Sequence, residues 1–237
     1  MVNLEDVLAA MALPGCPVCR LSSFRVERFL DRLIYEQIND LEVRQALRAS
    51  RGLCSPHAWQ LARMPNSPGL GLALVYRDVI QDVSLSVEAS QCHLPPRSIR
   101  GIFAGLIPFM RHLFRSGPSA EPPAVCPACS YAAQVEGSAL QALLAGLAQD
   151  GERVAHLLAE SGGLCLRHLV QGLAFDRRSP ALRRLAADAQ NRLQSLDQDL
   201  AAYIQHQDYR FRDGEAGPWS SAWQRAVSFV SGERDAP

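Results

Sequence analysis

Apolar residues recur along the chain at the three- and four-residue spacing that places side chains on one face of a helix. The clearest stretches lie between residues 24 and 38 and between residues 140 and 147. Their apolar positions are Phe24, Val26, Phe29, Leu30, Leu33, Ile34, Ile38, Leu140, Leu143, Leu144 and Leu147. This spacing predicts amphipathic α-helices. Runs of β-branched residues in strict alternation are missing, so strands are not expected, and the pattern favours an all-α fold.

Polar residues and prolines mark where these helices should begin. Asp40 and Asp150 are placed to cap short helices that follow them, because their side chains can accept hydrogen bonds from free backbone N–H groups. Pro68 and Pro180, each preceded by a serine, open two longer segments that end near residues 90 and 207. Serine followed by proline is a typical helix start, so both segments are predicted to be long helices.

A cysteine–histidine pattern occurs twice in the chain. The first copy reads Cys-Pro-Val-Cys over residues 16–19 and Leu-Cys-Ser-Pro-His over residues 53–57. The second reads Cys-Pro-Ala-Cys over residues 126–129 and Leu-Cys-Leu-Arg-His over residues 164–168. The offset between copies drifts only from 110 at the first cysteine to 112 at the Ser-Pro pair. We therefore expect a tandem duplication, with one helical unit over residues 1–117 and a second over residues 118–237.

Each copy supplies three thiols and one imidazole, the ligand set of a closed tetrahedral zinc site. The predicted ligands are Cys16, Cys19, Cys54 and His57 in the first copy, and Cys126, Cys129, Cys165 and His168 in the second. Cysteines three residues apart at a helix start lie on one face, where the helix dipole favours thiolate. Because each copy has four ligands, we expect each to close its own site, with two zinc ions per chain. The two units would then pack as a pseudo-twofold pair through the helices that begin at Pro68 and Pro180.

Other interpretations of the cysteines remain open. Two iron–sulfur clusters, each held by three cysteines and a histidine, would make the chain a redox protein, although such clusters more often take four cysteines. A dithiol oxidoreductase is a further option, but its Cys-x-x-Cys motif normally follows a strand in a βαβ unit. Buried free cysteines without any metal are the remaining alternative, since free cysteine packs as a small hydrophobic residue.

Composition narrows the function classes. The 237 residues are 48% hydrophobic, enough for a sizeable core, and 24 basic residues balance 24 acidic ones. The zero net charge gives no reason to expect nucleic-acid binding. All basic residues are arginine, which excludes a phosphate-loop lysine or a Schiff-base lysine and suggests a bacterial source. Acidic residues near Met1 and the lack of an apolar run argue against a signal peptide. A cytoplasmic protein without a transmembrane segment is expected.

Several other residues lie outside the repeated motif. Cys92, His93 and His206 could form a third shared site, but a lone histidine near a helix end more often contacts backbone carbonyls. The basic and apolar stretch Arg97–Arg115 is expected to pack between the units, with weak contact to a membrane surface or a partner as the alternative. Trp219 and Trp223, one helical turn apart, are predicted to anchor a C-terminal helix.

The repeated Cys-Pro-x-Cys and Leu-Cys-x-x-His elements resemble those of an uncharacterised bacterial helical family, a domain of unknown function. The resemblance covers most of the chain, including Asp208-Tyr209-Arg210-Phe211 and the terminal tryptophan-containing helix. It implies the helical architecture and the paired metal-binding elements. Because the family has no established activity, it implies no catalytic residue.

Catalytic motifs give no further lead. The chain has no Gly-x-Ser-x-Gly, His-Glu-x-x-His or phosphate loop. A closed four-ligand zinc site leaves no position for a reactive water. We therefore predict a non-catalytic zinc-binding protein that acts as an interaction or regulatory scaffold for an unknown protein partner. An iron–sulfur redox protein and a helical protein with a small-molecule pocket between its units are the alternatives.

Overall fold

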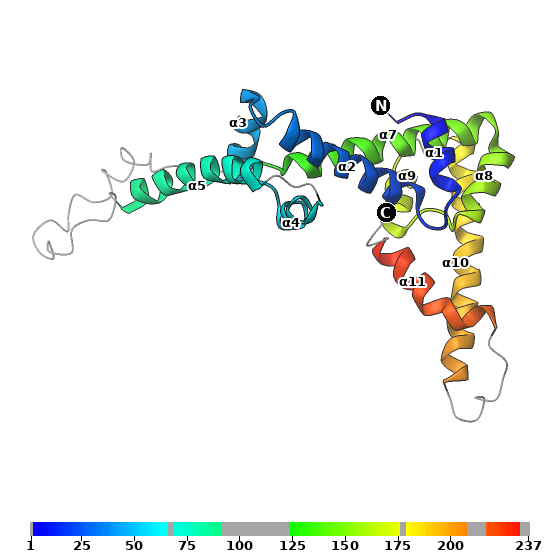
Figure 1. Cartoon of the computed structure of the whole chain (residues 1–237). Helices are drawn as coiled ribbons and strands as arrows, with labels where there is room; N and C mark the ends of the chain where they lie inside the picture. Colours follow the sequence, from blue (N-terminus) through cyan, green and yellow to red (C-terminus); the bar gives the residue numbers. More distant parts are fainter. Residues whose placement is uncertain (1, 66–68, 92–123, 176–178, 208–216, 233–237) are drawn as a thin grey trace, which may run out of the picture. The chain divides into compact units, whose positions relative to one another are not determined.

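The computed structural model describes residues 2–65, 69–91, 124–175, 179–207 and 217–232, and for residues 86–91 it describes the backbone alone. Over these residues the fold is all-α, as the apolar spacing predicted (Figure 1). The helices are α1 (Leu4–Met11), α2 (Pro17–Tyr35), α3 (Leu41–Ala49), α4 (Ser55–Arg63), α5 (Gly69–Gln91), α7 (Pro127–Gln149), α8 (Gly151–Glu160), α9 (Leu166–Leu173), α10 (Pro180–His206) and α11 (Ala222–Ser231), with a 3₁₀ turn η2 (Pro218–Ser221) before α11.

Most predicted helix starts are confirmed. The Asp40 side chain accepts hydrogen bonds from the backbone N–H groups of Glu42 and Val43, so it caps α3. Asp150 holds the corresponding place before α8 without a side-chain hydrogen bond to the helix. The helix α10 begins at Pro180, directly after Ser179. The Ser67-Pro68 pair lies outside the described residues.

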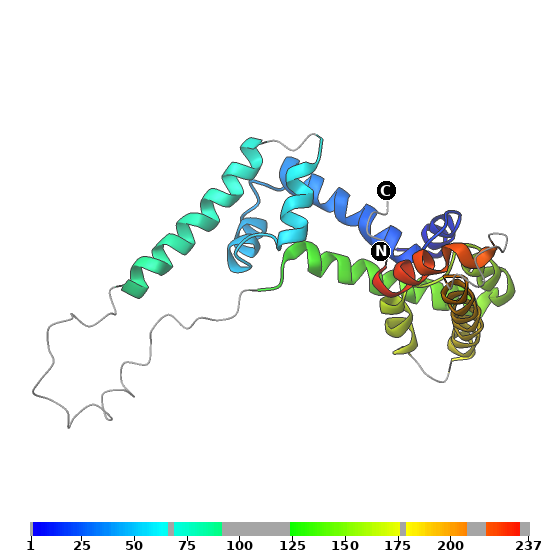
Figure 2. The same ribbon diagram turned by 90° about the horizontal axis from the view of Figure 1, so that it is seen from below.

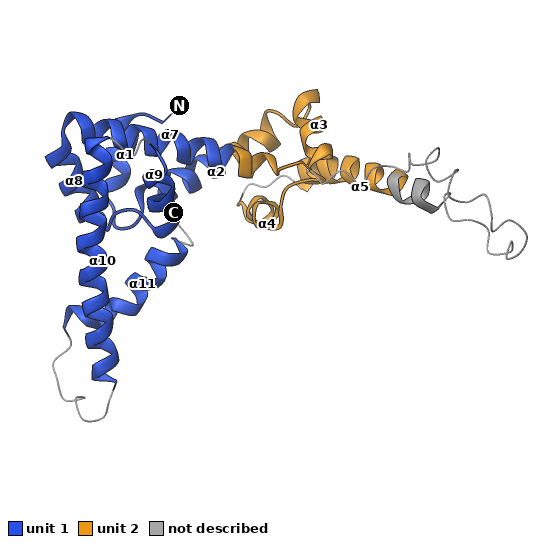
Figure 3. Cartoon of the chain, turned by 180° about the vertical axis from the view of Figure 1, so that it is seen from behind, with its two compact units in different colours: residues 1–27, 131–237 blue, residues 28–130 orange. Residues whose placement is uncertain are grey.

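The described residues form two compact units, shown in different colours in Figure 3. The first unit comprises residues 1–27 and 131–237, and the second comprises residues 28–130. Each unit therefore contains the start of one long helix, α2 or α7, together with residues from the other. The predicted boundary between residues 117 and 118 lies outside the described residues.

The core of the first unit is built from α1, the start of α2, and α7 to α10. Its most deeply buried large side chains are Val7, Val18, Leu140, Leu143 and Val154, each no more than 2% exposed. The C-terminal helix α11 packs against α9 and α10, and α10 lies beside it in both views (Figure 1, Figure 2). Burial of these leucines and valines, at about 25 cal/mol per Å² of apolar surface, is the main force that holds the unit together.

Two further contacts fix α11 and η2 on α10. The Trp219 ring stacks on His206 with 4.1 Å between ring centres. Arg225 donates a hydrogen bond of 2.8 Å to Asp199 on α10. Trp219 is thus an anchor as predicted, whereas Trp223 is 48% exposed. His206 also contacts the Ala202 carbonyl, at 2.9 Å from Nδ1, which confirms its expected contact with a backbone carbonyl.

The second unit contains the end of α2 together with α3, α4 and α5, and α3 packs against α5. Its buried residues include Leu30, Leu33, Leu47 and Leu61. Arg44 on α3 donates two hydrogen bonds to one carboxylate oxygen of Asp78 on α5, at 2.8 and 2.5 Å. Between α3 and α4, Gly52 adopts a φ of +89° and its Cα faces the Tyr76 ring, which leaves little room for a side chain.

No described helix is both long enough and apolar enough to cross a membrane. The segment that contains Cys92, His93 and Arg97–Arg115 lies outside the described residues.

Candidate metal sites

The eight predicted ligand residues gather into two groups, and each group draws on both copies of the motif. One group contains Cys16, Cys19, Cys165 and His168, and the other contains Cys54, His57, Cys126 and Cys129. Within each group the candidate ligand atoms all lie within 4.8 Å of one another. Each group lies inside a single unit, so either could hold one metal ion.

The sequence-based expectation that each copy closes its own site is wrong. In each copy the long helix extends further than the short helix that follows it returns. At 1.5 Å per residue, the 19 residues of α2 extend about 28 Å, whereas the 9 residues of α3 return only about 14 Å. The second copy has the same imbalance, with 23 residues in α7 and 10 in α8. In the structure the chain does not return to its own Cys-Pro-x-Cys element, because each Leu-Cys-x-x-His element lies in the other unit.

The paths of the two long helices explain why each site combines residues from both copies of the motif. In the first unit the start of α2 is grouped with most of α7, and in the second the start of α7 is grouped with the end of α2. The helix α2 therefore leads from the first unit into the second, and α7 leads from the second unit back into the first. The Leu-Cys-x-x-His element that follows one long helix consequently meets the Cys-Pro-x-Cys element that begins the other.

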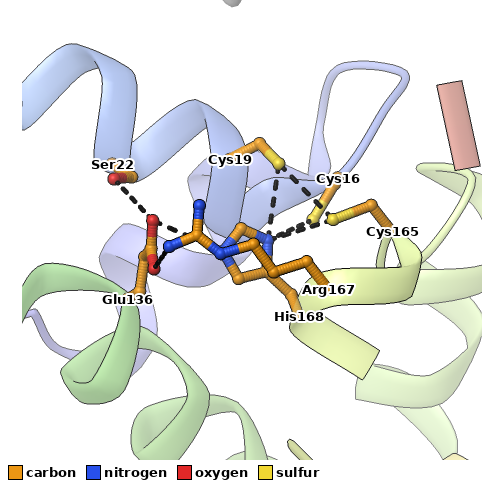
Figure 4. A network of polar contacts seen from close by, with 7 residues as sticks. All are labelled: Cys16, Cys19, Ser22, Glu136, Cys165, Arg167 and His168. Carbon is orange, nitrogen blue, oxygen red and sulfur yellow. Dashed lines mark hydrogen bonds and ion pairs between the residues drawn. The ribbon is translucent and has the colours of Figure 1, made fainter. Parts of the chain in front are cut away.

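In the first unit the three thiols surround one ring nitrogen of His168. The Sγ atoms of Cys16, Cys19 and Cys165 lie 3.4, 3.4 and 3.2 Å from His168 Nδ1. Cys19 Sγ and Cys165 Sγ are 3.6 Å apart, too far for a disulfide bond, which needs about 2.05 Å. Figure 4 shows the three sulfurs directed at the same edge of the imidazole. We call this group the His168 site.

Helix starts position these ligands. Cys16 directly precedes α2, Cys19 lies in its first turn, and Cys165 is the N-terminal cap residue of α9. His168, three residues after Cys165, therefore turns its ring back toward the same helix end. Positive ends of helix dipoles and free backbone N–H groups at these starts favour negatively charged sulfur.

A buried carboxylate supports the other edge of the His168 ring. Glu136 on α7 is 5% exposed, and its Oε1 lies 3.6 Å from His168 Nε2. That separation is longer than a hydrogen bond, and His168 Nε2 has no hydrogen-bond partner among the described residues. Ser22 donates to Glu136 Oε1 at 3.3 Å, and Arg167 donates to Oε2 at 2.7 Å (Figure 4). A carboxylate behind a ligating histidine is a common support in metal sites.

Sequence reasoning missed Glu136, although one signal marked it. Glu136 is the only charged residue among the 23 residues of α7, and it lies on a helix that is otherwise apolar, small or uncharged. A single acidic residue in such a helix needs a partner if it is buried. Its partners Ser22 and Arg167 carry no comparable signal, because each lies on a helix that has other polar residues.

The charges of the His168 site favour a cation. Burial acts to lower the pKa of His168, but interactions with the thiols of Cys165 and Cys19 and with Glu136 raise it to about 11. The pKa of Cys165 is lowered by hydrogen bonds from Cys16 and Cys19, and these shared bonds raise the pKa of Cys16. Burial also opposes ionisation of Glu136, yet its contacts with His168 and Arg167 hold its pKa below the usual value.

The second unit holds the other group, which we call the His57 site. The Sγ atoms of Cys54, Cys129 and Cys126 lie 3.1, 3.4 and 3.8 Å from His57 Nδ1. The Cys54 and Cys129 sulfurs are 3.5 Å apart. Cys54 caps α4, and Cys126 precedes α7, so helix starts again supply the ligands.

The surroundings of the His57 site differ from those of the His168 site. His168 is 2% exposed, whereas His57 is half-buried. Burial lowers the pKa of His57, and no ion pair joins this ring to a carboxylate in the part of the chain that the structure describes. Burial acts to raise the pKa of Cys126, but backbone N–H groups of Cys54 and Cys129 outweigh it and lower that pKa.

Comparison with known proteins identifies the family. A family model described as a family of unknown function, DUF6062, matches residues 1–237. The chain belongs to this family. An uncharacterized 23.9 kDa protein encoded in the xynA 3′ region of Caldicellulosiruptor sp. (strain Rt8B.4) is 23% identical over 218 residues, which cover 92% of this chain and 95% of that protein. No solved structure matches the chain.

Proposed function

We propose that this DUF6062 protein binds two zinc ions, one at the His168 site and one at the His57 site. The observation that carries the proposal is the geometry of the two groups. Around one tetrahedral zinc ion, sulfur and nitrogen ligands lie about 3.6 Å apart and two sulfurs about 3.8 Å apart. The distances in the His168 site are 3.2 to 3.4 Å and 3.6 Å, which supports a single small ion at the centre.

The same closeness argues against iron–sulfur clusters. A cluster holds its protein ligands on different iron atoms, which spreads those ligands further apart than the ligands of a single ion. In both groups every pair of ligand atoms is within 4.8 Å. The ligand set of three cysteines and one histidine is also standard for structural zinc. Zinc is therefore the better supported metal.

The proposed ions would connect distant parts of the chain. At the His57 site, Cys54 and Cys129 are 75 residues apart in the sequence. Contacts in the His168 site span still more of the chain, with Cys16 and His168 separated by 152 residues. Metal binding would therefore stabilise the fold as a crosslink does, because an unfolded chain cannot hold these ligands together.

We further propose a non-catalytic role as an interaction or regulatory scaffold in the cytoplasm of a bacterium, with a protein as the partner. Four protein ligands at each ion would leave no position for substrate or water, which disfavours hydrolysis. The balanced charge of the chain gives no support for nucleic acid as the partner.

Elemental analysis of anaerobically purified protein tests the proposal. We expect two zinc ions per chain and a colourless solution. X-ray absorption at the zinc edge should show three sulfur ligands and one nitrogen ligand. A brown protein with iron and sulfide would establish the cluster alternative, and an oxygen ligand from water would reopen the possibility of catalysis.

A further inference from the structure

The first unit contains a cavity of about 590 Å³ beside the His168 site. Residues of α8, α9, α10 and α11 and of the turn between α8 and α9 line it. Most of its wall is apolar, and its lining includes Leu158, Leu164, Leu185, Ala189, Leu196 and Phe229. Cavities of about 300 to 1,000 Å³ with apolar walls and a few polar groups are typical small-molecule sites.

Four charged side chains line the cavity, and two of them already have partners. Glu160 lies 3.4 Å from His156 on the exposed side of α8. Arg225 donates hydrogen bonds to Asp199 and to the Pro218 carbonyl. Asp188 and Arg192 are the other two.

Asp188 and Arg192 lie one turn apart on α10. Asp188 Oδ2 is buried without a hydrogen-bond partner among the described residues. No described residue accepts a hydrogen bond from the Arg192 guanidinium, and burial lowers the pKa of Arg192 despite the attraction of Asp188 and Cys16. Buried charged groups normally have hydrogen-bond partners, so this end of the cavity has unused capacity to bind a polar group.

The turn between α8 and α9 makes room for Arg192. Gly163 has a φ of +72°, and a Cβ atom there would overlap the Arg192 guanidinium. Only glycine fits both the backbone conformation and this close approach. The guanidinium is thereby held against the turn at the edge of the cavity.

We propose that this cavity binds a small apolar carboxylic acid whose carboxylate pairs with Arg192. The planar guanidinium matches a carboxylate in two parallel hydrogen bonds. Arg192 and Asp188 together carry no net charge, so a carboxylate adds one negative charge to this end of the cavity, whereas a doubly charged group such as phosphate would add two and is disfavoured. The apolar wall would hold the hydrocarbon part of the acid. This inference goes beyond metal binding, because neither metal site requires the cavity to be filled.

Calorimetric titration of the zinc-loaded full chain with decanoate tests the inference, with 1-decanol as the uncharged comparison. We expect saturable binding of one decanoate per chain and about tenfold weaker binding of 1-decanol, since the alcohol lacks the charge that pairs with Arg192. Absence of saturable decanoate binding would overturn the proposal, and so would equal affinity for the acid and the alcohol.

Variants separate recognition of the carboxylate from general effects on the fold. Arg192→Gln should weaken decanoate binding about tenfold to a hundredfold, the range for a lost hydrogen-bonded charge. The matched variant Arg183→Gln, on the exposed side of α10, should leave binding unchanged. Asp188→Asn should strengthen binding, because it removes a negative charge near the carboxylate. A change of the same sign and size in the Arg192 and Asp188 variants would contradict the proposal.

A cavity-filling variant tests the same site independently, in case the Arg192 variant does not fold. Ala189→Phe places a ring in the cavity without changing its charges, and it should abolish decanoate binding. Zinc content is measured for each variant, so loss of metal is distinguished from loss of the ligand site. Unchanged decanoate binding by Ala189→Phe would show that the acid binds elsewhere and would overturn the proposal.

Discussion

Pairs of alanine substitutions distinguish the crossed metal sites from sites that are closed within each copy. In the structure Cys16 shares a group with Cys165, whereas Cys54 belongs to the other group. The double variant Cys16→Ala/Cys165→Ala therefore damages one site and should retain one zinc ion per chain. Cys16→Ala/Cys54→Ala damages both sites and should retain none. Sites closed within each copy would give the opposite results.

The energetic difference between the two double variants should be large. Structural zinc in small peptides contributes on the order of 10 kcal/mol, which is comparable to the net stability of a whole domain. Once Cys16→Ala has removed the ion, adding Cys165→Ala in the same site should lower the free energy of unfolding only a little further. Cys54→Ala instead removes a second ion, so its cost should add to the first.

Zinc per chain and thermal unfolding followed by circular dichroism provide the two measurements. Purification is anaerobic because oxidation of the remaining thiols would also lower the zinc content and would be mistaken for the effect of a substitution. Retention of one zinc ion by Cys16→Ala/Cys54→Ala, with loss of both by Cys16→Ala/Cys165→Ala, would refute the crossed arrangement.

Three further predictions concern the support of the sites and the turns around them. Glu136→Gln should weaken zinc at the His168 site about tenfold to a hundredfold, the usual effect of changing a partner behind a ligand, and competition with a chromophoric chelator should show only one weakened ion. Chelation of both ions should lower the unfolding temperature. An unchanged temperature would show that the helical core is stable without metal. Gly52→Ala should lower the free energy of unfolding by about 1 kcal/mol or more, because Gly52 has a positive φ and faces the Tyr76 ring. Gly137→Ala within α7 should raise it by about 0.5–1 kcal/mol. Denaturant unfolding measures both, and equal effects would contradict this reasoning.

The sequence allowed the helices and the candidate ligands to be predicted because their signals are local. Asp40 caps α3 through hydrogen bonds to residues two and three positions away, and Pro180 begins α10 by its own backbone geometry. Cysteine and histidine at helix starts indicate a metal site without any knowledge of the fold. These features depend on neighbours within a single turn of chain.

The pairing of the motifs depends on distances that span the whole chain. Four ligands in each copy suggested a complete local site, but ligand number does not determine which ligands meet. The path of the chain between the units determines it, because α2 leads from the first unit into the second and α7 leads back. Helix lengths estimated from the sequence do not decide the pairing, because the loops on either side of α3 can add to the reach of the returning chain. The partner helix could therefore only be identified from the structure.

The two sites differ even though their ligands repeat. At the offset of 110 residues, the position that corresponds to Glu136 is Val26, and at the offset of 111 the position that corresponds to Arg167 is Pro56. The carboxylate and the guanidinium behind His168 are therefore absent from the matching positions of the first copy. A ligating histidine without such support is oriented less firmly, and a half-buried site is more accessible to competing ligands. We therefore expect the repeated ligand set to give two sites of unequal metal affinity, with His57 in the weaker one, because the residues behind the ligands are not repeated.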